Sequence, residues 1–89
     1  MSKIDDRPYF VAEVTRVNGE LAWNCEGAVL PEDVRKEVDG STTGLYEEKD
    51  PQVFYVAYMR LGHWLWGHGP NPDRAITHLT ERYEEATES

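Results

Sequence analysis

The sequence predicts an α+β domain of order ββαββα, in which a four-stranded antiparallel sheet has both helices packed on one face. Three observations carry this prediction: a hairpin signal at Asn18-Gly19, a second pair of apolar strands around Gly62, and two proline-led, acidic helix starts. The 89 residues suffice for a single domain with a modest core. Within residues 1–89 we expect a flexible N-terminus over 1–8 and a frayed C-terminus over 87–89.

The first hairpin is centred on Asn18-Gly19, the strongest short signal for a two-residue type I′ turn, because both positions need positive φ. This turn predicts a register in which Val14 lies opposite Trp23 and Val17 lies opposite Glu20. The other face of the hairpin is mixed to polar, as expected for a sheet with one buried side. The apolar face comprises Phe10, Ala12, Val14, Leu21, Trp23 and Cys25.

Residues 30–38 predict a short helix. Pro31 suits the first helical position, acidic residues follow it directly, and Gly40 can end the helix. Leu30, Val34 and Val38 recur every four residues and form one apolar stripe. Two helical turns are only marginally stable alone, so this helix must dock on the sheet. A polar loop over residues 41–51 follows.

The second hairpin differs from the first because neither of its faces is polar. Residues 52–60 form one strand, Gly62 takes the left-handed position of the turn, and residues 63–68 return. One face carries Phe54, Val56, Tyr58, Trp64 and Trp66, and the other carries Val53, Tyr55, Ala57, Met59 and Leu65.

Two interpretations of this hairpin are open. It is a central element covered by the helices on one side and by the loop 41–51 on the other, or it is an aromatic patch that binds a partner or a second copy. The loop is polar and makes a poor lid, so we expect one face to stay partly exposed. We expect Trp64 and Trp66 to lie under the helices and Tyr55 to lie outside.

The last helix begins at Asn71-Pro72, which combines a good N-cap with a good first helical residue. It is expected to run to about Ala86. The buried stripe of this helix is predicted to comprise Ala75, Ile76, Leu79, Tyr83 and Ala86.

The net charge is −8, from 17 acidic against 9 basic residues. This balance disfavours direct binding to nucleic acid, which needs clustered Lys and Arg. The acidity fits either adaptation to a salt-rich cytoplasm or attraction to a basic partner. No apolar run approaches the ~20 residues of a membrane span and no leader is visible, so we expect a cytoplasmic protein that does not bind membranes.

Candidate chemical groups do not form a recognisable catalytic set, which predicts a protein that is not an enzyme and needs no cofactor. His63 and His68 are five residues apart on one strand and point to opposite faces, while His78 lies on a helix. We therefore expect three unrelated histidines and no metal site. Cys25 falls on the core face as a small hydrophobe.

The segment from Phe54 to about Ala86 combines two strands, the run Gly67-His68-Gly69-Pro70-Asn71-Pro72-Asp73-Arg74-Ala75 and a helix. It resembles the strand–glycine–acidic helix start of HicB-like antitoxin domains over about a third of the chain. Asn71-Pro72 stands where that family has a Thr before the helix. The resemblance implies a small protein that binds and neutralises a basic partner.

The sequence thus favours a small acidic, non-enzymatic protein-binding or regulatory module. The expected partner is a protein, a basic one if the acidity is functional, and a homodimer through the aromatic patch is a further expectation. The alternative is a viral-type inhibitor of the anti-CRISPR or anti-restriction class, whose acidic surface imitates nucleic acid. The predicted partner-binding residues are Tyr55, Tyr58, Trp64 and Trp66 of the second hairpin and the loop acids Glu47, Glu48 and Asp50.

Overall fold

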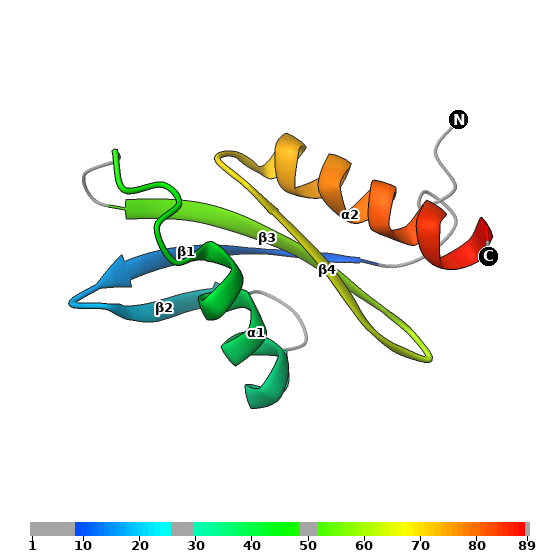
Figure 1. The fold of residues 1–89 in the computed structure, drawn as a ribbon, viewed down its shortest axis with the longest axis horizontal. Coiled ribbons are helices and arrows are strands. Elements are labelled where there is room, and N and C mark those ends of the chain that lie inside the picture. The colour runs from blue at the N-terminus through cyan, green and yellow to red at the C-terminus, as the bar shows by residue number, and fades with distance from the viewer. Residues whose placement is uncertain (1–8, 26–29, 49–51, 89) are drawn as a thin grey trace.

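Figure 1 shows the computed structural model, in which four antiparallel strands form one sheet with two helices against it. The structure describes residues 9–25, 30–48 and 52–88. The elements follow the chain as β1 (Phe10–Val17), β2 (Glu20–Cys25), α1 (Glu32–Thr42), β3 (Gln52–Leu61), β4 (His63–Gly69) and α2 (Pro72–Glu88). The strand order is β2-β1-β3-β4. The predicted α+β class and ββαββα order are confirmed.

The first hairpin has the register that its turn predicts. Asn18 and Gly19 have φ values of 52° and 82°, and Val17 pairs with Glu20. Val14 lies opposite Trp23, so both side chains point to the same face. Trp23 is half-buried against the core formed by this face, whereas its neighbours Ala22 and Asn24 are exposed.

The second hairpin also follows its predicted pattern. Gly62 has φ 73°, and Tyr58 pairs with Trp66 across β3 and β4. Strand β3 lies inside the sheet between β1 and β4, and it is buried on both faces. Phe54, Val56 and Tyr58 belong to the core on one side of the sheet, and Ala57 and Met59 belong to the core on the other.

The two helices pack on opposite faces of the sheet, so the prediction that both lie on one face is wrong (Figure 1). The α1 side places Leu30 and Val38 against Val14, Phe54 and other residues of that face. Helix α2 places Ala75, Leu79 and Tyr83 against Ala57 and Met59. The physical reason is the two-sided apolar character of β3, because each of its faces must be removed from water separately.

Helix α1 begins and ends later than predicted. Pro31 has an extended backbone, with φ −57° and ψ 153°, and it stands at the N-cap position rather than in the first turn. Gly40 does not stop the helix, which continues to Thr42. Thr42 is fully buried, which shows that the last turn is pressed against the sheet.

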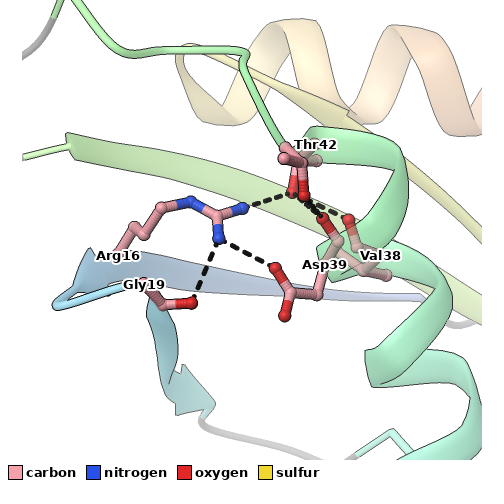
Figure 2. Close-up of polar contacts among 6 residues, drawn as sticks. Arg16, Gly19, Val38, Asp39 and Thr42 are labelled. Carbon is pink, nitrogen blue, oxygen red and sulfur yellow. Dashed lines mark hydrogen bonds and ion pairs between the residues drawn. The ribbon is translucent and has the colours of Figure 1, made fainter.

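Arg16 anchors this last turn (Figure 2). It follows Ala12 and Val14 on the same face of β1, so its side chain points toward α1. One guanidinium nitrogen donates to Asp39 Oδ1 at 2.8 Å, and the other donates to Thr42 Oγ1 at 3.1 Å. The Thr42 hydroxyl in turn donates to the Val38 carbonyl at 2.7 Å. A single side chain thus joins the first hairpin to the end of α1.

Helix α2 approaches β4 closely because two strand residues lack a side chain. A Cβ built on Gly67 would lie 2.7 Å from the His78 carbonyl carbon. One built on Gly69 would lie 2.7 Å from the Ala75 nitrogen. Both distances are too short for a carbon atom, so the helix can take this position only while the two residues remain glycine.

The two ends of α2 differ in how well they were predicted. The N-cap is confirmed, since Asn71 Oδ1 accepts a hydrogen bond from the Arg74 amide at 2.9 Å. Ala86, which was predicted to lie on the buried stripe, is exposed. Helix α2 extends to Glu88; residues 1–8 and Ser89 lie outside the described residues, so the flexible N-terminus and the frayed C-terminus stay predictions.

Replacing Gly67 by Ala should destabilise the protein by about 1–3 kcal/mol, because the added methyl group meets helix backbone that cannot move alone. Gly40 offers a matched control, since a Cβ there has nothing within 4 Å. Gly40→Ala should raise the free energy of unfolding by roughly 0.5–1 kcal/mol through helix propensity. Urea unfolding measures both, and equal effects of the two substitutions would contradict the close packing of α2 on β4.

Arg16→Met keeps most of the aliphatic stem and removes the donors that hold Asp39 and Thr42. We expect a loss of about 1–2 kcal/mol, since a buried hydroxyl and a carboxylate lose a partner. A double-mutant cycle with Asp39→Asn tests the cause. Asp39→Asn should cost less in the Arg16→Met background than in the wild type, and strict additivity would show that the ion pair does not anchor α1.

Candidate functional site

The predicted aromatic patch is mostly core. Tyr58 is fully buried and Trp66 is 4% exposed, so neither can contact a partner in this structure. Trp64 and Tyr55 are half-buried. Among the described residues, the large apolar side chains that are clearly exposed are Val17 and Leu45, and neither lies on the second hairpin. The accessible remainder of the expected patch is therefore part of Tyr55 on one face of the sheet and part of Trp64 on the other.

The polar loop contributes more cover than its composition indicates. Tyr46 has φ 62°, an unusual value for a residue with a side chain, and its ring stacks on Phe54 with centroids 4.9 Å apart. Tyr46 thus closes the core beyond the end of α1. Glu47 and Glu48 remain exposed beside a groove of about 470 Å³ that Leu45 and Pro70 also line. Asp50 lies outside the described residues.

Two of the three histidines meet, so the prediction that they are unrelated is wrong for His68 and His78. Their ring centroids lie 5.0 Å apart, and the His68 amide donates to His78 Nδ1 at 3.0 Å. Strand β4 is an edge strand, and α2 reaches around that edge, which the spacing along the chain does not reveal. His63 is exposed near the turn, at the other end of β4.

The partly buried His68 ring lies among aromatic and basic side chains. The Tyr46 hydroxyl lies 2.5 Å from His68 Nδ1, and Arg82 Nε lies 3.2 Å from His78 Nε2. Arg82 also covers the Trp66 ring at 4.5 Å from its centroid. Burial, and then the nearby His78 and Arg82, lower the pKa of His68 to about 4. Tyr46, His78 and Arg82 thus pack around His68 at the β4 edge, and the lowered pKa of His68 favours its neutral form.

The described residues hold no group of three or more His, Cys, Asp or Glu side chains placed to bind a metal ion. Cys25 is partly buried against the α1-side core, as predicted for a small hydrophobe. Burial and a hydrogen bond with Cys25 raise the pKa of Tyr58. The side chains of Cys25 and Tyr58 both pack in the core on the α1 side of the sheet.

The surface that the described residues leave open is the outer half of the sheet. Helix α2 covers β4 and β3, and the α2-side faces of β1 and β2 receive little cover from it. Glu13, Ala22 and Asn24 are exposed there, and Thr15 and Tyr55 are half-buried. The Tyr55 hydroxyl donates to Glu13 Oε2 at 3.2 Å, and this bond is the main cause that raises the pKa of Tyr55.

This open face combines apolar area with negative charge. Its described members carry two carboxylates and no Lys or Arg. They are Glu13, Thr15 and Val17 of β1, Glu20, Ala22 and Asn24 of β2, and Val53 and Tyr55 of β3. Tyr55 of this face was predicted from the sequence to be accessible, but the β1–β2 part was expected to be only the polar side of the first hairpin, because only the placement of α2 shows which part of the sheet the helix leaves bare.

Comparisons with known proteins found no matching family model, no curated protein and no solved structure with significant similarity. The resemblance to HicB-like antitoxin domains therefore stays a prediction. No helix in the described part of the chain is long and apolar enough to cross a membrane.

The lowered pKa of His68 predicts a pH-dependent stability. Unfolded His titrates near 6.5, so the unfolded state takes up a proton between pH 6.5 and about 4 while the folded state does not. The free energy of unfolding should therefore fall as the pH is lowered through this window. His68→Asn should flatten the fall between pH 7 and 5, as urea titrations at several pH values would show.

His63→Asn is the control for this experiment, because its side chain is exposed on the same strand. It should leave the slope of stability against pH as in the wild type. An unchanged slope in His68→Asn would show that burial of His68 does not cause the pH dependence.

Proposed function

We propose that this chain is a small, acidic, non-enzymatic module that binds a protein partner through the open half of its sheet. The observation that supports this proposal is the unequal cover of the two faces. Helix α1 and Tyr46 pack over the β1–β3 core of one face, whereas on the other face α2 packs over β3 and β4 and hardly contacts β1. An open sheet surface with half-buried Tyr55 and Thr15 is suited to a protein contact.

The charge of this face favours a basic partner. Glu13 and Glu20 supply negative charge, and the described residues of the face hold no base to offset it. Charge complementarity of this kind speeds association and selects among partners. The partner class is thus a protein with a basic, partly apolar surface, which agrees with one of the two interpretations of the net charge, the other being adaptation to a salt-rich cytoplasm.

The alternative of nucleic-acid imitation receives less support. An imitation of a phosphate backbone needs unpaired acids, but two acids of α1 are already paired. Asp39 binds Arg16 at 2.8 Å, and Glu32 lies 3.9 Å from Lys36. The exposed acids of the loop, Glu47 and Glu48, follow α1 and line a groove with Leu45 and Pro70.

The test is binding to a partner isolated by affinity capture on the full chain and then purified. Glu13→Lys should weaken the complex by roughly tenfold or more in isothermal titration, because it places a like charge against the basic partner. Raising the salt concentration should weaken the wild-type complex as well.

Glu81→Lys is the matched control, since it makes the same charge change at an exposed site on α2. It should have a much smaller effect on affinity. The double variant Glu47→Lys/Glu48→Lys separates the two acidic surfaces. If this loop variant weakens binding and Glu13→Lys does not, the open face is not the binding surface.

A further inference from the structure

The two edge strands of the sheet, β2 and β4, differ in whether other groups cover their outward-pointing backbone. In a two-residue hairpin, the pair beside the turn exchanges both backbone hydrogen bonds, and pairs alternate from there. Because Val17 and Glu20 form that pair, Ala22 and Asn24 turn their backbone groups toward β1. Leu21, Trp23 and Cys25 therefore turn theirs toward the free edge of β2.

The same alternation, carried across the sheet, can be checked at the opposite edge. It passes from β1 to β3 and β4 through the observed registers and leaves the backbone of His68 pointing out of β4. The His68 amide does donate outward, to His78 Nδ1 at 3.0 Å. Helix α2 thus covers the β4 edge, while the described residues place no strand beyond β2.

We propose that the free edge of β2 pairs with β2 of a second copy, antiparallel and two-fold symmetric, with Ala22 opposite the same residue of that copy. This register joins the two sheets into one of eight strands. Leu21 of each copy then lies opposite Trp23 of the other copy, and the backbone groups of both residues point toward the partner strand. Each of these two pairs exchanges two backbone hydrogen bonds, which gives four in all. The open face of one copy continues directly into that of the other.

The side chains of β2 are self-complementary in this register. On the α1 side, Leu21 of each copy meets Trp23 of the other, so two half-buried apolar side chains lose further contact with water. On the open face, the Glu20 carboxylate meets the Asn24 amide, a pair of acceptor and donor. Small Ala22 lies at the two-fold axis, and no like charges stand directly opposite each other.

The groove beside this edge fits the same occupant. It has a volume of about 230 Å³ between β2 and α1, and Leu21, Trp23 and Arg35 are among its lining residues. The paired strand brings its own Leu21 and Trp23 to the mouth of the groove. The proposed interface consists of one short strand edge and the side chains beside it. Such an interface buries little surface, so we expect a weak dimer.

The expected salt dependence distinguishes this dimer from the complex with a basic partner. Two chains of charge −8 repel each other, and salt screens that repulsion. Self-association should therefore strengthen as salt is raised, whereas binding of a basic partner should weaken. Failure of one proposal leaves the other measurable.

The first experiment is cysteine cross-linking in a Cys25→Ala background. Opposed residues whose backbone groups point away from each other have Cα atoms about 4.5 Å apart, a separation that a disulfide can span. Ala22→Cys should form a disulfide-linked dimer under mild oxidation. Asn24→Cys is the matched control, because it is equally exposed on the same face but lies opposite Glu20. Equal cross-linking of the two variants would overturn the register.

The second experiment is sedimentation of the full chain at a series of concentrations. Ala22→Glu places two carboxylates at the two-fold axis and should weaken the dimer by roughly fivefold. Ala86→Glu makes the same exchange at an exposed site on α2 and should leave the dimer unchanged. A wild-type chain that stays monomeric throughout, or a dimer indifferent to Ala22→Glu, would overturn the proposal.

Discussion

Strand β3 must be covered on both faces, and this constraint determines the rest of the structure. Phe54, Val56 and Tyr58 face one side, and Ala57 and Met59 face the other, all of them buried. The described part of the chain has two helices to supply the cover, and each face receives one. Helix α2 packs on β4 and β3 and hardly contacts β1, so other groups must cover the rest of that face. Tyr46 adds to the cover on the α1 side, and on the α2 side the described residues leave that part of the sheet bare.

Most of the strand structure could be predicted because its signals are local. The Asn18-Gly19 turn determines the register of its own hairpin, and Gly62 does the same for the second. The sides of the helices could not be predicted in this way, since they depend on packing between distant segments. The apolar character of both faces of β3 was visible, but the polar composition of loop 41–51 hid the inward turn of Tyr46.

The candidate site was predicted less well, for a related reason. Large aromatic side chains in a small acidic chain indicate an interface, yet here Tyr58 and Trp66 are needed for the core. Tyr55 remains partly accessible because its face lies at the margin of α2. The contact between His68 and His78 depends on how α2 passes the β4 edge, and no spacing in the sequence records that path.

The treatment of the two sheet edges connects fold and function. A bare edge invites uncontrolled pairing, and proteins commonly limit it by shortness or charge. Strand β2 has six residues and a carboxylate at its start, and the whole chain repels its copies. These features oppose disordered stacking while still permitting the proposed register, in which Glu20 meets Asn24 of the second copy. In the two proposals, the same acidity has two roles: it would favour a basic partner at the open face, and it would restrict self-association to one weak, ordered pair.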